Sequence, residues 1–180
     1  MKDNNVKIIG GKWKRKNISF NEAMGLRPTL GRVRETLFNW LGQDLNNKKC
    51  LDLFAGTGAL GFEALSRNAE SCTFVENNPS TFQKLIENKE NLKADNAIIK
   101  KIHADFFIKN NDELFDIIFF DPPFVLDNSI QLIEFIRKFL KPHGVIYFET
   151  NIKIPENFLE IIKYFFVLIF NYLLFNSATL

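Results

Sequence analysis

The chain has few of the residues that mark secreted or metal-binding proteins. Among its 180 residues are two histidines and two cysteines, Cys50 and Cys72. Each cysteine begins an apolar run and neither fits a metal-ligand spacing, which favours small buried thiols in a reducing compartment. We therefore expect a cytoplasmic protein with no metal site.

Apolar runs long enough to cross a membrane are also lacking. The N-terminal stretch MKDNNVKIIGG contains no apolar segment of the kind that a secretory signal requires. Residues 161–175 read IIKYFFVLIFNYLLF, but Lys163 and Asn171 interrupt this stretch, which is shorter than the roughly 20 apolar residues of a membrane span. Buried strands are the better interpretation, and no membrane partner is expected.

Net charge is small, but it is distributed unevenly. The whole chain carries +2, whereas residues 1–41 hold nine basic and three acidic side chains, so residues 42–180 are net acidic. We interpret residues 1–41 as a basic arm followed by a first helix, and residues 42–180 as the core of one compact domain. Such an arm is typical of a protein that binds a polyanion. A solvated tail has the same charge pattern.

From residue 50 onward, apolar runs alternate with amphipathic helical segments. Several runs are apolar nearly throughout, which is typical of a parallel sheet covered by helices on both faces. Repeated strand and helix units with right-handed crossovers build a doubly wound α/β sheet, whose ligands bind at the carboxyl ends of the strands. A first helix is predicted after Thr29 or Gly31. The further predicted elements are strands at 50–54, 72–76, 97–102, 115–120 and 145–149, and helices at 59–67, 79–93 and 128–140.

A glycine-rich turn follows the first of these strands. Residues 52–61 read DLFAGTGALG, in which Gly56, Gly58 and Gly61 match the pattern G-x-G-x-x-G. Glycine lets the chain turn tightly and lets a ligand approach the backbone. Glu76 ends the next predicted strand, where a carboxylate is placed to bind two ribose hydroxyls. NAD and S-adenosylmethionine both present such a ribose, so this pattern alone leaves both open.

Asp52 favours S-adenosylmethionine over a dinucleotide. An acid just before the first glycine repels a pyrophosphate but attracts an ammonium or sulfonium group. No Tyr-x-x-x-Lys pair is present, and neither histidine is in a hydride-transfer setting. Asp105 is placed to accept a hydrogen bond from an adenine amino group, with Phe106 or Phe107 against the ring. Asp105 as a helix cap is the alternative, and one of the two phenylalanines is expected in the core.

Residues 119–124 read FFDPPF, an apolar strand end followed by an acid and two prolines. Proline has no N–H, so the Asp121 carboxylate and nearby carbonyls form a group of acceptors without donors. Such a group fits a nucleobase amine, because two acceptors hold both hydrogens and aim the lone pair at a methyl donor. Phe124 offers an aromatic face to a base that has left its stack. A rigid turn is the alternative for Asp-Pro-Pro alone, and the route of the released proton stays open.

In combination these motifs resemble the bacterial 16S ribosomal RNA guanine-N2 methyltransferases of the RsmD type. The resemblance covers residues 8–149, through IIGGKWKRK, GLRPTLGRVRETLFNWLG, CLDLFAGTGALGFEALSRNA, FFDPPF and VIYFE. It implies a class I S-adenosylmethionine-dependent methyltransferase with a Rossmann-like, mostly parallel sheet and a basic N-terminal extension. It also implies methylation of N2 of guanine 966 in the small-subunit RNA. The expected partner is 16S rRNA in a 30S subunit or an assembly intermediate, and a monomer is expected.

Carried over by position, the resemblance assigns three groups of residues. The cofactor-binding residues are Asp52, Phe54, Gly56, Gly58, Glu76, Asn77, Asp105 and Phe106. The catalytic residues are Asp121, Pro122, Pro123 and Phe124. The RNA-binding residues, of which the arginines suit bidentate phosphate contacts, are Lys12, Lys14, Arg15, Lys16, Arg27, Arg32 and Arg34.

The C-terminal segment departs from the family pattern. Family members close the sheet with an antiparallel hairpin, whereas residues 158–180 are almost wholly apolar and contain no glycine or proline turn. We therefore expect an altered end to the sheet, with a poorly covered edge.

Three alternative functions remain beside the ribosomal one. An N6-adenine DNA methyltransferase uses the same kind of acceptor group, although no separate target-recognition domain is visible in this chain. A catalytically silent RNA-binding assembly factor needs only the basic arm. A nicotinamide oxidoreductase is a more distant possibility.

Overall fold

The computed structural model describes residues 4–21, 29–123 and 129–150, together with the backbone of residues 166–171. Its centre is a six-stranded sheet with the order β5-β4-β3-β6-β7-β8, and each neighbouring pair is parallel. This arrangement confirms the predicted doubly wound α/β fold. The strands are β3 (Lys49–Asp52), β4 (Ser71–Glu76), β5 (Ala97–Lys101), β6 (Phe115–Phe120), β7 (Leu140–Thr150) and β8 (Phe166–Asn171).

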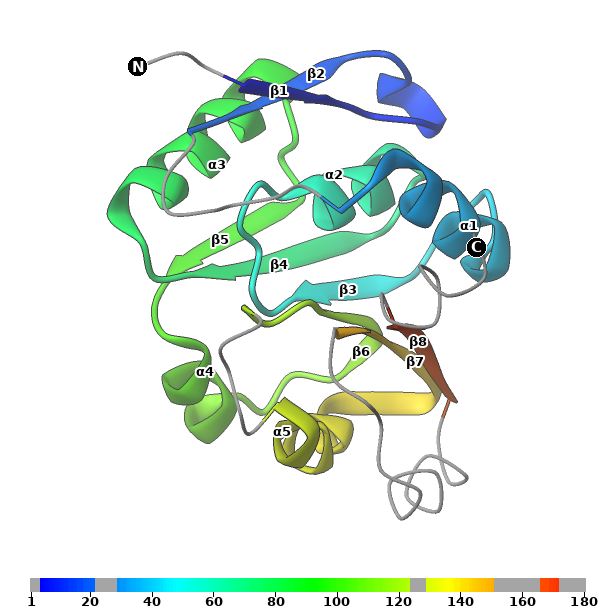
Figure 1. Ribbon diagram of the computed structural model, residues 1–180, viewed down its shortest axis with the longest axis vertical. Helices are drawn as coiled ribbons and strands as arrows, with labels where there is room; N and C mark the ends of the chain where they lie inside the picture. Colours follow the sequence, from blue (N-terminus) through cyan, green and yellow to red (C-terminus); the bar gives the residue numbers. More distant parts are fainter. Residues whose placement is uncertain (1–3, 22–28, 124–128, 151–165, 172–180) are drawn as a thin grey trace, which may run out of the picture.

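Helices cover both faces of the sheet (Figure 1). Among the described residues, α1, α2 and α3 lie on the face that also carries the N-terminal hairpin, and α4 and α5 lie on the opposite face. The predicted helix at 128–140 is shorter than expected, because the chain leaves it through a 3-10 turn and enters β7 at Leu140. On the first face are α1 (Gly31–Leu41), α2 (Ala59–Ser66) and α3 (Pro79–Leu92), and on the second are α4 (Ala104–Asn110) and α5 (Ser129–Ile136), followed by η2 (Arg137–Phe139).

Side-chain alternation along β6 explains why the four successive residues 117–120 are all apolar. Ile117 and Phe119 pack in the core cluster that includes residues of α1, α2 and α3. Ile118 and Phe120 pack in a second cluster with residues of α4 and α5. Because successive side chains of a strand point to opposite faces, a strand covered on both sides is apolar at every position.

The two cysteines lie opposite each other in the central strands. Cys50 of β3 pairs in register with Cys72 of β4, and both are free thiols with no exposed surface. Burial raises the pKa of each thiol well above its ordinary value. Both cysteines are therefore core residues, as predicted, and not reactive thiolates.

The basic arm is a folded hairpin and not a solvated tail. β1 (Asn4–Lys7) and β2 (Asn17–Phe20) pair antiparallel, and η1 (Gly11–Trp13) lies between them. Ile8, Trp13 and Ile18 are buried in the same core cluster as residues of α1 and α2. The arm's apolar side chains therefore anchor it on the domain while its basic side chains stay at the surface.

The sheet ends in a parallel strand in the part of the chain that the structure describes. β8 pairs parallel with β7, with Val145 opposite Phe166 and Thr150 opposite Asn171. Residues 158–165 and 172–180 lie outside the described residues. Among those described, no helix is both long and apolar enough to cross a membrane.

Candidate functional site

Four acidic side chains lie at the carboxyl ends of neighbouring parallel strands. Asp52 ends β3, Glu76 ends β4, Asp121 follows β6, and Glu149 is close to the end of β7. Because these strands are parallel, their carboxyl ends meet at one edge of the sheet. The structure therefore brings together three acids that the sequence predicted and a fourth, Glu149, that it did not.

Backbone hydrogen bonds fix the glycine turn against β4. The Ala55 amide donates to the Val75 carbonyl over 3.0 Å, and the Gly58 amide donates to the Ala55 carbonyl over 2.7 Å. Gly56 and Gly58 have φ angles of +49° and +75°, a region that glycine enters without strain. The Gly56 amide donates to Oε2 of Glu76 over 3.1 Å. The turn and the acid of the next strand thus form one unit.

Glu76 is held in place by backbone amides at both carboxylate oxygens. Besides the Gly56 contact, its Oε1 accepts a hydrogen bond from the Asn78 amide over 2.7 Å. A carboxylate oxygen accepts more than one hydrogen bond, so each retains capacity for a ligand hydroxyl. The neighbouring Asn77 is exposed, and its Nδ2 lies 3.0 Å from Nδ1 of His103. This geometry suits a group that presents two adjacent hydroxyls.

Asp52 is buried beneath the start of α2 and is only 2% exposed. Its Oδ2 accepts a hydrogen bond from the Gly61 amide over 3.1 Å. Burial, and to a lesser extent the charge of Glu76, raise the pKa of Asp52 to about 8, against the opposing effect of the Gly61 hydrogen bond. A Cβ at Gly61 would lie 2.3 Å from the Phe74 ring, so the third glycine of the pattern serves the packing of α2 on β4.

The predicted adenine-binding residues lie at the start of α4. Asp105 is exposed in the first turn of this helix. Phe106 is 60% exposed and Phe107 is 3% exposed, so Phe107 is the core residue of the pair and Phe106 is free to stack on a flat ligand. Phe54 is partly exposed, with its ring centroid 5.7 Å from that of Phe120.

Asp121 has an acidic environment. Burial raises its pKa well above the ordinary value, the charges of Glu149 and Asp52 raise it further, and the Thr29 side chain opposes the rise. The residue as a whole nevertheless keeps some exposed surface. A carboxylate with a raised pKa is a stronger base than an ordinary one, and such groups are typical of functional sites.

The residues after Asp121 provide acceptors and no backbone donors. Pro122 is buried and Pro123 is exposed, and neither has an N–H. The strand β6 ends at Phe120, immediately before the acid. Phe124, the fourth predicted catalytic residue, lies outside the described residues.

Glu149 is a further acid at this edge of the sheet that the sequence interpretation missed. It is 2% exposed, and its Oε2 accepts a hydrogen bond from the Tyr147 hydroxyl over 2.8 Å. Phe120 pairs in register with Phe148, which places Glu149 beside Asp121 on the neighbouring strand. An acid at the end of a predicted strand was the available signal, the same one that identified Glu76.

Comparisons with known proteins agree with this architecture. Residues 6–165 match the model of the family described as Conserved hypothetical protein 95. The chain is 42% identical over 151 residues to Ribosomal RNA small subunit methyltransferase D of Escherichia coli (strain K12), covering 82% of this chain and 76% of that protein. It is 40% identical over 162 residues to the protein of the same name from Haemophilus influenzae, with 84% of each covered.

The chain belongs to this family. The resemblance to RsmD-type methyltransferases is thereby confirmed. The crystal structure of a putative methylase from Haemophilus influenzae superposes with a TM-score of 0.70 at 37% identity, covering 84% of this chain and 85% of that chain. A 16S rRNA N2 G1207 methyltransferase from T. thermophilus, solved with AdoMet and guanosine, superposes with a TM-score of 0.62 at 22% identity, covering 81% of this chain and 40% of that one, which shows the shared class I fold.

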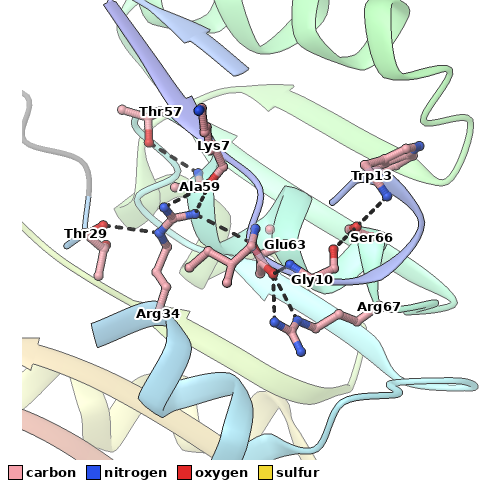
Figure 2. Close-up of polar contacts among 12 residues, drawn as sticks. Lys7, Gly10, Trp13, Thr29, Arg34, Thr57, Ala59, Glu63, Ser66 and Arg67 are labelled. Carbon is pink, nitrogen blue, oxygen red and sulfur yellow. Dashed lines mark hydrogen bonds and ion pairs between the residues drawn. The ribbon is translucent and has the colours of Figure 1, made fainter. Parts of the chain in front are cut away.

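Arg34, one of the RNA-binding residues carried over from the RsmD type, faces inward. It is 3% exposed, and its Nε donates to the Thr29 carbonyl over 3.2 Å. Both Nη1 and Nη2 donate to the Lys7 carbonyl over 3.1 Å, and Nη1 lies 3.6 Å from the Glu63 carboxylate (Figure 2). The phosphate-contact prediction for Arg34 is therefore wrong, because its donors are engaged within the protein.

Glu63 is the centre of this buried ion network, which consists of Arg34, Glu63 and Arg67. It has no exposed surface and accepts hydrogen bonds from the Ile9 and Gly10 amides over 2.8 and 2.7 Å. Arg67 approaches the same carboxylate with its Nη2 at 2.9 Å. The network thus joins the arm to α1 and α2 (Figure 2).

The other predicted RNA-binding residues that the structure describes lie at the surface. Their exposure is compatible with phosphate contact, and their charge is the arm's main source of positive potential. Arg27 lies outside the described residues. No group of three or more His, Cys, Asp or Glu side chains suited to a metal ion occurs in the described part of the chain. The exposed basic residues are Lys12, Lys14, Arg15, Lys16 and Arg32.

Proposed function

We propose that this protein transfers a methyl group from S-adenosylmethionine to the exocyclic N2 of a guanine in 16S ribosomal RNA, guanine 966 of the family's substrate. The substrate is the small ribosomal subunit or an assembly intermediate. Relatives named Ribosomal RNA small subunit methyltransferase D, at 40% and 42% identity, support methylation of ribosomal RNA. The observation that carries the proposal is the acceptor group at Asp121, beside the glycine turn.

The residues around the glycine turn fit the proposed cofactor. Glu76 is oriented by two backbone amides and has acceptor capacity left for ribose hydroxyls. Phe106 presents an exposed ring at the start of α4, next to the exposed carboxylate of Asp105. These groups suit a ribose and an adenine. Asn77 is exposed beside Glu76 and belongs to the same proposed site.

The carboxylate cluster, consisting of Asp52, Asp121 and Glu149, complements a cation. Glu149 and Asp52 both raise the pKa of Asp121, and a positive charge beside them opposes this effect. S-adenosylmethionine supplies both the methyl group and a sulfonium charge. The neutral product of transfer lacks that charge, so we expect the cluster to favour substrate over product.

The acceptor amine is bound by oxygen atoms on this chain. The Asp121 carboxylate and the Pro122 carbonyl accept its two hydrogens and orient the nitrogen lone pair. The N–CH3 bond forms as the S–CH3 bond breaks, and the amine then releases one proton. Asp121 takes up this proton, because its raised pKa makes it a better base than an ordinary carboxylate. The folded arm presents Lys12, Lys14 and Lys16 to the RNA backbone.

A labelled-methyl assay tests this function directly. The protein and labelled cofactor are incubated with 30S particles, naked 16S rRNA and duplex DNA, and the modified nucleoside is identified by mass. We expect N2-methylguanosine in ribosomal RNA. Label on DNA adenine alone would establish the N6-adenine alternative. Binding of 30S particles without calorimetric binding of S-adenosylmethionine would establish a silent assembly factor.

A further inference from the structure

Asn77 and His103 join two loops at the carboxyl edge of the sheet. Asn77 directly follows β4, and His103 lies between β5 and α4, 26 residues further along the chain. Nδ2 of Asn77 is 3.0 Å from Nδ1 of His103, and both residues are exposed. This hydrogen bond therefore bridges the two loops that carry the proposed cofactor ligands.

The loop after β4 is fixed around Asn77. The Glu76 carboxylate accepts a hydrogen bond from the Asn78 amide over 2.7 Å, which closes a turn with Asn77 inside it. The Asn78 side chain in turn accepts from the Ser80 and Thr81 amides and caps α3. The Asn77 backbone therefore has a set position beside Glu76, the proposed ribose ligand.

His103 belongs to the start of α4, but its side chain does not cap the helix. It occupies the N-cap position, and its carbonyl accepts a hydrogen bond from the Phe107 amide over 3.0 Å. Its ring bonds Asn77 instead of the helix amides. Asp105 and the exposed ring of Phe106, the proposed adenine ligands, follow directly in the chain. The bridge therefore links the ribose side of the proposed site to the adenine side.

The direction of this bond determines which atom Asn77 offers to a ligand. An amide nitrogen only donates, so Nδ1 of His103 is the acceptor, and the proton of the neutral ring lies on Nε2. Oδ1 of Asn77 accepts no hydrogen bond among the described residues. It remains an acceptor for the hydroxyl and amino donors of an adenosine, as the Glu76 and Asp105 carboxylates do.

We propose that His103 is a positioning residue for S-adenosylmethionine: its unprotonated Nδ1 holds the Asn77 amide so that Oδ1 is the atom offered to the adenosine. His103 touches no ligand in this role. The inference deepens the proposed function and rests on it for the identity of the ligand. The bond between Asn77 and His103 exists in the free protein and is testable there.

The first experiment is calorimetric binding of S-adenosylmethionine to variants of His103. Asparagine places an oxygen near the position of Nδ1, whereas glutamine places its amide near Nε2, and phenylalanine has no acceptor. We expect His103→Phe and His103→Gln to weaken binding about five-fold, as loss of one neutral hydrogen bond does, and His103→Asn to stay within about two-fold of wild type. Equal affinities for His103→Phe, His103→Asn and wild type would overturn the proposal.

His143→Asn is the matched control. His143 is the other histidine of the chain, exposed near the amino end of β7, and its φ of +64° is one that asparagine tolerates. This change should leave the cofactor affinity unchanged. The His103 variants should unfold near the wild-type temperature, because His103 is exposed and its side chain caps no helix. Affinity losses that follow losses of thermal stability would show a merely structural role and contradict the proposal.

A double-mutant cycle tests whether His103 acts through Asn77. Asn77→Ala removes the proposed acceptor and should weaken cofactor binding at least as much as His103→Phe does. In the Asn77→Ala background, His103→Phe should have no further effect, because both changes remove the same interaction. A further loss of affinity in that background would show that His103 contacts the cofactor directly, and it would overturn the assigned role.

NMR of the free protein tests the bond without any ligand. In alkaline buffer, where imidazoles are neutral, we expect a nitrogen–nitrogen coupling across the bond between Asn77 Nδ2 and His103 Nδ1. The side-chain amide signals of Asn77 should shift in His103→Phe. Those of Asn96, whose Nδ2 bonds the Ala69 carbonyl over 2.9 Å, should not. Absence of the coupling, with the same Asn77 signals in both proteins, would contradict the proposed contact.

Activity separates this inference from the proposed function. If the wild-type protein methylates ribosomal RNA, His103→Phe should raise KM for S-adenosylmethionine about five-fold and leave kcat near wild type, because the contact is the same in the ground state and the transition state. A lower kcat with unchanged KM would contradict the positioning role. A wild type that binds S-adenosylmethionine but methylates no ribosomal RNA would overturn the proposed function alone, because the affinity series still decides the role of His103.

Discussion

Two groups of buried charges in this molecule are built in opposite ways. The carboxylate cluster gathers like charges at the strand ends, where burial and mutual repulsion raise the pKa of Asp121. The buried ion network places Glu63 between Arg34 and Arg67, where each charge has a partner. Like charges kept together are poised to respond to a ligand, whereas paired charges hold segments in place.

Glu63→Ala should produce the largest effect, because it leaves two buried guanidinium groups and two backbone amides without their acceptor. The free energy of unfolding should fall by about 3–5 kcal/mol. Urea denaturation measures this. Glu113→Ala is the control: Glu113 is partly exposed, with a 3.5 Å ion pair to Lys49, and should cost about 0.5 kcal/mol or less. Similar decreases in the free energy of unfolding for Glu63→Ala and Glu113→Ala would show that the buried ion network does not hold the segments in place.

Asp121→Ala should lower methyl transfer by about a hundred- to a thousand-fold, as loss of a group that acts on the transition state does. The affinity for S-adenosylmethionine should stay within a few-fold, because this acid serves the acceptor amine. Calorimetry and the labelled-methyl assay measure the two quantities. Asp112→Ala, at an exposed position, is the control. Parallel loss of cofactor binding in Asp121→Ala would contradict the assigned role.

Asp52→Asn should flatten the dependence of stability on pH. The pKa of Asp52 is about 8 in the folded protein and 3.8 ordinarily, so the native state binds more protons between these values. The stability of the wild type should therefore fall as pH rises through this window, and the variant should lose this component. Urea denaturation from about pH 4 to about pH 9 measures both profiles. Parallel profiles would show that Asp52 ionises normally.

Glu149→Gln tests whether the charge of Glu149 influences the ionisation of Asp121. Removing this negative charge lowers the pKa of Asp121, so the acidic limb of the rate profile should move to lower pH. The measurement is the initial rate across a pH series. Glu70→Gln, an exposed acid, is the matched control. If the acidic limb of the rate profile stays at the wild-type pH, Glu149 does not influence the pKa of Asp121.

Lys14→Glu combined with Arg15→Glu should have the smallest effect on the stability of the fold, but it should measurably weaken RNA binding. Both side chains are exposed. We expect weaker binding and a salt dependence of log K that is shallower by about 1.5 in slope, as expected for two lost phosphate contacts. Filter binding over a salt series measures this. Lys109→Glu combined with Lys138→Glu, at other exposed positions, should leave the slope unchanged. Equal slopes for the two double variants would show that Lys14 and Arg15 do not contact the RNA.

Most of the central sheet and much of the candidate site were predictable from local patterns. Apolar runs identified β3, β4, β5 and β6 to within one or two residues at each end. The N-terminal hairpin was missed because each strand has only four residues, although Val6 and Ile8 alternate, as do Ile18 and Phe20. The short helix α4 was also missed, and Asp105 proved to lie in its first turn.

The errors concern side chains whose role depends on distant neighbours. Arg34 was taken for a phosphate ligand, yet it lies one helical turn before the buried Phe38 and points the same way. Arg32, two residues earlier, is exposed. Helical periodicity places these two arginines on different faces of α1. Treating them as members of one basic run hides this difference. Glu149 was missed because the strand at 145–149 was predicted without considering the acid at its end.

The sequence by itself determined the central strands, the glycine turn and the donor-free acceptor motif at Asp121, because each depends on the chemistry of consecutive residues. Only the tertiary structure decided which charges are buried, which are paired, and which carboxylates lie side by side. Burial and Coulomb interactions depend on neighbours that the fold brings in from other strands and helices. A residue's charge state and hydrogen-bond partners are therefore properties of its surroundings, which spacing along the chain does not specify.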